Sequence, residues 1–312
     1  MKAVLQFRAS PGFCARLAAL EGLDVTVVAE ADKAEFARAM CDADVLLHAL
    51  EPVTEAVMEG APLLRLIQKI GVGVNTIDLD AARRRGIAVC NMPGTNTQAV
   101  AEMTMLLMLA VLRRVTALDV LTRAGEGWTP PLAVIDALGE LGGREVGLLG
   151  FGAVGRRLVP MLHGFGARVV YTARQSQADA GISFLPLAEL LRRVDILSLH
   201  LPLAPATARI IDAAALAAMK RGSILINTAR GGLVDEAALH AALTSGHLAA
   251  AGLDVFDQEP VPASNPLLAL DNIVATPHLS WLTAETLDRS LGIIIENCRR
   301  LGAGKKLLHR VV

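Results

Sequence analysis

The stretch Val146-Gly-Leu-Leu-Gly-Phe-Gly-Ala-Val-Gly155 decides which fold this chain can adopt. An apolar run breaks into glycine at Gly150, Gly152 and Gly155, then continues as an amphipathic segment, which predicts a buried strand, a tight turn and a helix. These glycines permit the turn, let backbone approach a pyrophosphate, and let the helix pack closely on the strand. The helix N-terminus would present free N–H groups to phosphate. A dinucleotide-binding turn is therefore favoured over an ordinary glycine-rich turn.

The composition suits a protein of two ordinary-sized domains. The chain has 312 residues, of which 53% are hydrophobic, and this is enough for two cores. Lys and Arg total 30 against 31 Asp and Glu, so no charge excess points to nucleic acid or to an acidic membrane surface. The most apolar run, Ala99 to Leu112, contains Glu102 and is too short to span a membrane.

The cysteines and the N-terminus bear on the cellular compartment. Cys14, Cys41, Cys90 and Cys298 are scattered, with no C-x-x-C and no metal-ligand spacing. We therefore expect reduced thiols, no metal and a cytoplasmic location. The segment Met1–Arg8 is too short and too soon charged for a signal peptide.

Residues 1–95 alternate β-rich runs with amphipathic stretches, which predicts a small parallel sheet with helices on both faces. Gly71-Val-Gly-Val74 directly follows one such run, so we place it at the carboxyl edge of the sheet, where ligands bind in open α/β folds. A plain strand-to-helix turn is the alternative. The expected strands are Ala3–Phe7, Val25–Val28, Val45–Leu47, Leu66–Ile70 and Ile87–Cys90, and the clearest helices are Ala31–Cys41 and Leu79–Arg85.

The breaker cluster Pro93-Gly-Thr-Asn-Thr97 is expected to be the hinge into a second domain, with Asn96 or Thr97 capping the apolar helix that follows. Beyond that helix, residues 121–141 contain Trp128 and lack a strong period, so we expect an extended arm. The pattern of a full dinucleotide fold follows, with strands expected at 145–149, 168–172, 194–199, 223–227, 248–253 and 272–275.

The helical run Ala284–Leu301 is long enough to return to the first domain and pack on it. The predicted architecture is therefore α/β, with two doubly wound parallel-sheet domains. A discontinuous, flavodoxin-like substrate domain would comprise residues 1–95 plus 285–312. A Rossmann dinucleotide-binding domain would comprise residues 96–284.

Three stretches each place a reactive side chain just beyond a strand of the second domain, namely Arg230, Glu259 and His278. Arginine binds a carboxylate through two parallel hydrogen bonds. Histidine moves a hydroxyl proton, and a neighbouring carboxylate fixes its tautomer. Taken singly, the three are more simply interpreted as a surface arginine, a capping glutamate and a core histidine. Their coincidence beside a dinucleotide fold favours hydride exchange with a hydroxy acid.

The chain resembles the D-isomer-specific 2-hydroxyacid dehydrogenases, the family of glyoxylate/hydroxypyruvate reductase and phosphoglycerate dehydrogenase. The resemblance runs from about Leu66 to Leu291, and residues 1–65 match only in pattern. It rests on the segments Gly71–Val74, Arg85–Gly94, Gly150–Gly155, Met219–Gly222, Asn227–Asp235, Leu253–Phe256, Glu259–Pro260 and Thr276–His278.

The resemblance implies roles for individual residues. Arg230 would bind the substrate carboxylate and keto oxygen, His278 would be the acid/base catalyst, and Glu259 its partner. The Val72–Gly73 backbone would complete the carboxylate site. A homodimer through the second domain is also implied, with the 121–141 arm embracing the partner. Besides the three glycines, the residues expected around the cofactor are Thr104, Ala153, Val154, Pro202, Thr228, Ala229, Asp254 (near the nicotinamide amide), His278 and Ser280.

The expected reaction is reduction of a small 2-keto acid to the D-hydroxy acid. Phosphoglycerate-type relatives carry an arginine near the position of His48, and a mostly neutral imidazole is a poor phosphate anchor. We therefore expect glyoxylate or hydroxypyruvate rather than a phosphorylated substrate, with D-3-phosphoglycerate dehydrogenase as the alternative. A non-catalytic nucleotide-sensing relative is disfavoured by the intact triad, and phosphite or formate oxidation by Ser280-Trp281 after His278.

The segment Arg168-Val-Val-Tyr-Thr-Ala-Arg174 bears on which nicotinamide cofactor is used. Dinucleotide folds normally place Asp or Glu about 20 residues beyond the glycines, where it accepts hydrogen bonds from the ribose hydroxyls. Here that position is Ala173, which leaves room for a 2′-phosphate. Arg174 would pair with the phosphate and Ser176 would add a hydrogen bond. We therefore expect NADP(H). The alternative is that Arg174 is a solvated loop residue and the protein also accepts NAD(H).

Overall fold

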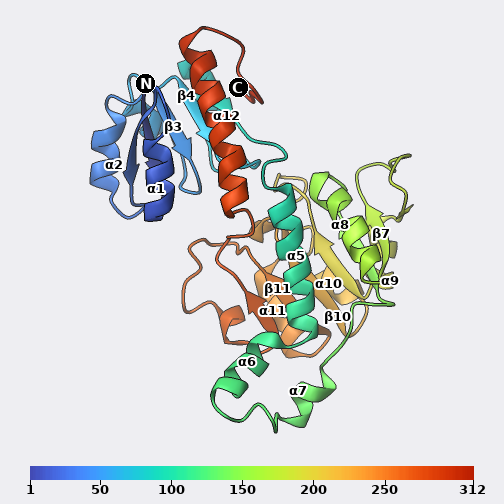
Figure 1. Ribbon diagram of the computed structural model, residues 1–312. Helices are drawn as coiled ribbons and strands as arrows, with labels where there is room; N and C mark the ends of the chain where they lie inside the picture. Colours follow the sequence, from blue (N-terminus) through green and yellow to red (C-terminus); the bar gives the residue numbers. More distant parts are fainter. The chain divides into compact units, whose positions relative to one another are not determined.

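The computed structural model describes all 312 residues. The chain divides into two compact units, one of residues 1–96 with 282–312 and one of residues 97–281. Each unit contains one sheet, and every strand pair within the two sheets is parallel. The expected α/β class with two parallel sheets is therefore confirmed (Figure 1).

The first unit is built on a five-stranded sheet of order β2-β1-β3-β4-β5, which is the flavodoxin-like order. Its strands are β1 (Lys2–Gln6), β2 (Asp24–Val28), β3 (Val45–His48), β4 (Leu66–Lys69) and β5 (Ala88–Cys90). Its helices are α1 (Pro11–Ala18), α2 (Lys33–Met40), α3 (Glu55–Glu59), α4 (Leu79–Arg85) and α12 (Ala284–Gly302).

Alternation along the strands assigns the helices of the first unit to two faces. Leu46 and Ile67, which are register partners, pack in one core with side chains of α2, α3 and α4. The next pair along, Leu47 and Gln68, faces the other way, where the Gln68 side chain accepts a hydrogen bond of 2.7 Å from Asn297 on α12. Arg16 of α1 pairs with Asp288 of α12 on this second face. The C-terminal helix α12 thus packs on the second face of this sheet and belongs to the first unit.

The second unit contains a seven-stranded sheet of order β12-β11-β10-β9-β6-β7-β8. The order reverses between β6 and β9, the arrangement of a dinucleotide-binding fold. Its strands are β6 (Glu145–Leu149), β7 (Arg168–Thr172), β8 (Ser183–Phe184), β9 (Ile196–Leu199), β10 (Ser223–Asn227), β11 (Leu248–Leu253) and β12 (Ile273–Ala275). The six expected strands are present. The edge strand β8 was not predicted, because two residues carry no periodic signal.

Helices cover both faces of this sheet. On one face, α5 (Thr97–Leu112) and α8 (Ala153–Gly164) share a core with Ile224 and Ile226. On the other face, α9 (Leu187–Arg193), α10 (Ala213–Ala218) and α11 (Glu236–Thr244) share a core with Leu225. This alternation along β10 explains why its sequence reads as an unbroken apolar run: both of its faces are buried.

The expectation of an extended arm at 121–141 was wrong in part. The region contains α6 (Val115–Arg123) and α7 (Leu132–Asp136), joined by an irregular segment. Arg114, at a φ of 51°, separates α5 from α6, and α7 begins directly after Pro131, as proline favours helix N-termini. Helices of nine and five residues are shorter than the window of about 11 residues needed to reveal a period in the sequence. No helix anywhere in the chain is both long and apolar enough to cross a membrane.

Candidate active site

The predicted glycine turn lies where the strand order of the second unit reverses. Gly150 directly follows β6 at a φ of 103°, a conformation that residues with side chains rarely adopt. A Cβ at this position would lie 2.5 Å from the carbonyl oxygen of His200, the residue that follows β9. The loops after β6 and β9 therefore approach each other so closely that only glycine fits. This is the place where open α/β sheets bind dinucleotides.

The start of α8 fits a pyrophosphate. Gly152 precedes the helix without a side-chain cap, so the N–H groups of its first turn, beginning at Ala153 and Val154, receive no side-chain acceptor there. A Cβ at Gly152 would meet nothing within 4 Å, whereas one at Gly155 would lie 2.9 Å from the Gly150 carbonyl oxygen. Open space in front of uncapped helix N–H groups, with helix and strand tightly packed behind, is what phosphate binding requires.

Arg230, Glu259 and His278 come from the loops after three neighbouring strands, β10, β11 and β12. The Arg230 loop is held by Asn227, the last residue of β10. The Asn227 side chain donates to the Arg230 carbonyl oxygen at 2.9 Å and accepts from the Ala229 N–H at 3.0 Å. The Arg230 guanidinium also donates to the Ala229 carbonyl oxygen at 2.6 Å. Both ends of one amide thus fix the backbone that carries the guanidinium.

Gly231 allows the Arg230 loop and the Glu259 loop to touch. A Cβ at Gly231 would lie 1.8 Å from the Phe256 carbonyl carbon and 2.3 Å from the Asp257 nitrogen. Real Cβ atoms do not approach backbone this closely. The glycine after Arg230 is therefore required by the approach of the neighbouring loop.

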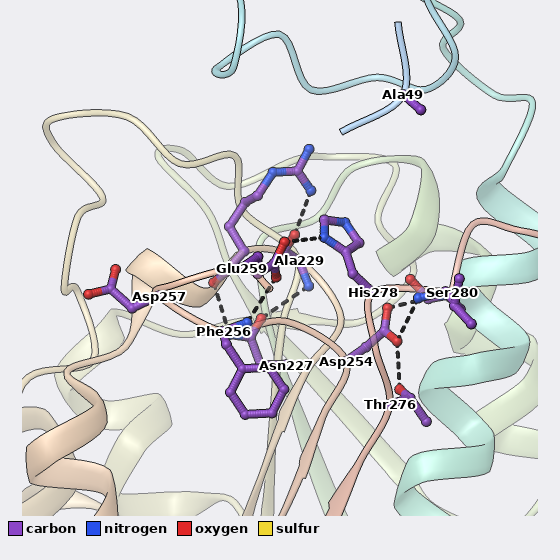
Figure 2. A network of polar contacts seen from close by, with 12 residues as sticks. Ala49, Asn227, Ala229, Asp254, Phe256, Asp257, Glu259, Thr276, His278 and Ser280 are labelled. Atoms are coloured by element: carbon purple, nitrogen blue, oxygen red, sulfur yellow. Dashed lines mark hydrogen bonds and ion pairs between the residues drawn. The ribbon is translucent and has the colours of Figure 1, made fainter. Parts of the chain in front are cut away.

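Glu259 and His278 form a direct pair. The carboxylate accepts from the His278 ring at 2.6 Å, between Oε2 and Nδ1, and from the Phe256 N–H at 3.0 Å on Oε1. Figure 2 shows the two side chains pointing toward each other. The side chains are 17% exposed for His278 and 32% exposed for Glu259. The pair is thus shielded but still open to a small molecule.

Asp254 holds the loop that carries His278. It is fully buried at 0% exposure. One carboxylate oxygen accepts from the Thr276 hydroxyl at 2.5 Å and the Leu279 N–H at 3.0 Å, and the other accepts from the Ser280 N–H at 2.9 Å. Figure 2 shows the contacts of Asp254 with Thr276 and Ser280.

His278 itself has a φ of 54°, which is unusual for a residue with a side chain. Its N–H donates to the Asp254 carbonyl oxygen at 2.7 Å. Such backbone geometry persists when surrounding contacts over-determine it, and Asp254 supplies those contacts. Asp254 therefore takes a direct part in holding the loop that carries His278. Its proposed contact with the nicotinamide amide stays a prediction.

At this site, burial and neighbouring charges shift the pKa values of Arg230 and Glu259 in opposite directions. Burial lowers the pKa of the Arg230 guanidinium, and the Glu259 carboxylate counteracts that shift. Burial is also the largest influence on Glu259 and raises its pKa, but His278, the Phe256 N–H and the charge of Arg230 together outweigh it. The net pKa of Glu259 lies below its ordinary value. The carboxylate is therefore ionised at neutral pH and accepts hydrogen bonds only.

The other expected cofactor residues lie at the same carboxyl edge. The buried Thr104 hydroxyl of α5 lies 2.8 Å from that of Thr228, which follows β10. Pro202 lies in the loop after β9, where its carbonyl oxygen accepts from Thr207 at 2.7 Å. Arg174 and Ser176 are exposed in the loop after β7.

The predicted substrate residues of the first unit follow β4 and β3. Val72 lies in the turn after β4 and is 45% exposed, with Gly73 beside it. His48 ends β3 with 3% exposure, and its Nε2 lies 2.6 Å from the Glu51 carbonyl oxygen. Burial and the charge of Lys69 lower the pKa of His48 to about 3. His48 is thus neutral, as predicted, and its register partner is the buried Lys69, a cation that the sequence pattern does not reveal.

Three contributors to the site were missed as functional residues. Asn227 and Thr276 lie inside recognised motifs, yet only the structure shows the hydrogen bonds that they make to the catalytic loops. In the sequence, Gly231 is simply the first of a glycine pair, and the approach of Phe256 explains it. A signal was available at each position, because a polar or glycine residue stood beside a predicted catalytic one.

Comparison with known proteins agrees with this geometry. Residues 105–280 match the D-isomer specific 2-hydroxyacid dehydrogenase, NAD binding domain. A glyoxylate reductase of Korarchaeum cryptofilum is 38% identical over 265 residues, covering 82% of this chain and 79% of the relative. A D-3-phosphoglycerate dehydrogenase of Mycobacterium bovis is 40% identical over 279 residues, covering 88% of this chain but only 52% of the relative. The chain thus spans about half the length of that second protein.

Solved structures share the whole architecture. A protein of Thermus thermophilus is 40% identical with a TM-score of 0.89, and all of both chains is covered. A formate dehydrogenase of Staphylococcus aureus in complex with NAD is 28% identical, with a TM-score of 0.90 over 100% of this chain and 99% of that one. An acyclic imino acid reductase in complex with NADPH and D-Arg is 26% identical, with a TM-score of 0.85 over all of both chains.

The family match spans more than half of the chain, and the reductase relative is covered over most of its length. A glycine turn suited to a dinucleotide and an Arg–Glu–His set at the same sheet edge are consistent with that match. The chain therefore belongs to the D-isomer specific 2-hydroxyacid dehydrogenase family, and it is an oxidoreductase that uses a nicotinamide dinucleotide.

Proposed function

We propose that this enzyme reduces a small, unphosphorylated 2-keto acid, glyoxylate or hydroxypyruvate, to the D-hydroxy acid with NADP(H). The observation that carries the catalytic part is the 2.6 Å contact between His278 Nδ1 and Glu259. Because the ionised Glu259 only accepts, Nδ1 carries the proton of that bond. The other ring nitrogen, Nε2, is then the one that exchanges a proton with the substrate.

The roles of the three side chains follow from this assignment. Arg230 binds the substrate carboxylate through its planar fork and stabilises the charge that develops on the keto oxygen. His278 Nε2 gives its proton to that oxygen, and the ring is left neutral with its Nδ1 proton on the Glu259 side. Glu259 fixes the tautomer and the orientation of the ring. The reduced nicotinamide, when bound, supplies the hydride.

The substrate proposal is supported by the neutral His48 at the edge of the first sheet. With a pKa of about 3, this imidazole offers no charge to a phosphate. Glyoxylate reductase relatives of comparable length also match, with 79% of one such chain covered. The backbone of Val72 and Gly73 stays the predicted carboxylate contact in this unit.

D-3-phosphoglycerate dehydrogenase is the second candidate, and one observation favours it. Lys69 is the register partner of His48 and donates to the Ala49 carbonyl oxygen, so the carboxyl edge of this sheet does contain a cation. Oxidation of reduced cofactor, followed by absorbance with glyoxylate, hydroxypyruvate and 3-phosphohydroxypyruvate, decides between the two. A higher kcat/KM for 3-phosphohydroxypyruvate than for hydroxypyruvate would refute the unphosphorylated substrate.

The preference for NADP(H) is supported by the residues after β7. The position that normally carries the ribose-binding carboxylate is Ala173, and the exposed Arg174 and Ser176 follow. A planar guanidinium pairs well with a phosphate. Comparison of kcat/KM for NADPH and NADH tests the preference, and a preference for NADH would overturn it. Arg174→Ala should reduce any NADPH preference selectively.

A homodimer is supported by the apolar surface of the 121–141 arm. Its large side chains stand out from the protein, with Trp128 94% and Leu132 76% exposed. Large apolar side chains exposed close together in the sequence are typical of interaction surfaces. Sedimentation velocity should find a dimer that Trp128→Glu weakens. A wild-type monomer at micromolar concentration would exclude this assembly.

A further inference from the structure

The loop after β7 is fastened to the glycine turn by contacts that the proposed function does not use. This loop, residues 173–182, carries Arg174 and Ser176 and is mostly exposed. Gln177 is a residue through which this loop is hydrogen-bonded to the rest of the unit. The Gln177 side chain donates to the carbonyl oxygen of Phe151, inside the glycine turn, at 3.3 Å. The two segments that would hold the phosphates and the adenosine ribose are therefore tied together directly.

Tyr171, the only tyrosine in the chain, anchors the Gln177 backbone. Its hydroxyl accepts from the Gln177 N–H at 2.6 Å and donates to the Gln177 carbonyl oxygen at 3.3 Å. The ring is fully buried between Phe151 and Phe184, with centroids 4.4 Å and 5.6 Å away. A rigid, buried side chain thus ends in a hydroxyl that holds an exposed loop.

Arg156, in the first turn of α8, holds the same loop from the other side. Its guanidinium lies over the Phe151 ring, 4.9 Å from the centroid. It donates to the Gln177 side-chain oxygen and, at 3.1 Å, to the Asp179 carboxylate. The Asp179 side chain is 78% exposed, so this ion pair contributes little to folding. It does place a cation beside the one carboxylate of the loop, which would otherwise repel a nearby phosphate.

We propose that Tyr171 and Arg156 are positioning residues for recognition of the adenosine 2′-phosphate. They hold residues 174–177 against the glycine turn, so that Arg174 and Ser176 are presented in one arrangement at the end of β7. Arg156 also neutralises Asp179. A loop that is ordered before binding loses less conformational entropy on meeting its ligand. This inference rests on the proposed use of NADP(H) and adds two residues, of which Tyr171 acts through Arg174 and Arg156 acts both through Arg174 and through the charge of Asp179.

The test is calorimetric titration of the whole enzyme with 2′,5′-ADP and with 5′-AMP, which differ only in the 2′-phosphate. Tyr171→Phe keeps the ring packing and removes the hydroxyl, and Arg156→Ala removes the guanidinium contacts with Gln177, Asp179 and the Phe151 ring. Each variant should lower the affinity for 2′,5′-ADP about three- to tenfold, which is the effect expected from the loss of one hydrogen bond. Affinity for 5′-AMP should change by less than about twofold. Arg157→Ala is the matched control, because this neighbouring arginine contacts Gln98 instead.

A double variant shows whether Tyr171 acts through Arg174. If it does, Tyr171→Phe should cost much less affinity for 2′,5′-ADP in the Arg174→Ala background than in the wild type. Equal weakening of both ligands, no weakening, or full additivity would overturn the inference while leaving the NADP(H) proposal standing. A wild-type enzyme that binds 5′-AMP as tightly as 2′,5′-ADP would overturn both.

Discussion

The two ends of the seven-stranded sheet are built differently at their carboxyl edge. At the β10–β12 end, the loops of Arg230, Glu259 and His278 are joined by hydrogen bonds to buried groups, with Asp254 fully enclosed. At the β7 end, the loop of Arg174 is exposed and is held through Gln177.

The contrast matches the functions that we propose for the two ends. Proton transfer requires a donor within hydrogen-bond reach and in a fixed orientation, so the catalytic loops depend on one another. Discrimination between two cofactors requires only a difference in affinity. Exposed residues on a separate loop can set that difference without disturbing the catalytic groups. Substitutions at the β10–β12 end should therefore strongly lower turnover or stability. Substitutions at the β7 end should change the affinity for one cofactor and leave the other properties unchanged.

The largest expected effect is loss of the proton donor. His278→Ala should lower kcat by about 10²–10⁴, the usual contribution of general acid catalysis, while cofactor affinity measured by calorimetry stays near that of the wild type. His163→Ala, an exposed histidine on α8, is the control and should retain full turnover. Near-normal turnover of the His278 variant would remove the proposed mechanism.

A single added methyl group should disrupt the close packing between the Arg230 loop and the Glu259 loop. Gly231→Ala forces a methyl group into the backbone of Phe256, and overpacking of this kind costs about 1–3 kcal/mol or more in unfolding free energy. Urea unfolding measures it. Gly292→Ala, in helix α12 with open space around it, should instead be neutral or stabilising. Equal stability of the Gly231 variant and wild type would contradict the tight contact between these loops.

The charge of the catalytic pair should appear in the pH dependence of stability. The pKa of folded Glu259 lies below its ordinary value of 4.5, so the folded state binds fewer protons there than the unfolded state. Its contribution to stability is present in full above pH 4.5 and is lost as pH falls through the folded pKa. The stability difference between wild type and Glu259→Gln should therefore shrink on acidification. Urea midpoints at pH 7 and in this acidic range measure it, and a constant difference would contradict the lowered pKa of Glu259 in the folded state.

The smallest effect is expected at the exposed loop. Asp179→Asn removes the ion pair with Arg156, whose partners are 78% and 40% exposed, so the urea midpoint should not move measurably. The same measurement on Tyr171→Phe should show a small decrease, because its hydroxyl accepts a hydrogen bond from the Gln177 backbone. If Asp179→Asn unfolded the domain, the contrast between a rigid catalytic end and a tunable cofactor end would fail.

Much of this arrangement could be predicted because its signals are local. The apolar runs of β6, β9 and β10 follow from strands buried on both faces, and turn residues mark where each strand ends. Parallel strands present their carboxyl ends at one edge, so Arg230, Glu259 and His278 could be placed together from their positions alone. The short helices α6 and α7 and the strand β8 were missed, because a few residues do not establish a period.

The sequence by itself determined the fold class and the glycine turn, and it predicted Arg230, Glu259 and His278 as the catalytic side chains, because each of these depends on residues close together in the chain. Only the tertiary structure decided which groups hold those side chains. Asp254 reaches Ser280, Gly231 meets Phe256, and Tyr171 anchors Gln177 through contacts whose geometry depends on how loops and strands pack. Hydrogen bonding and close packing act over a few ångströms in space, so partners of this kind become visible only once the chain has folded.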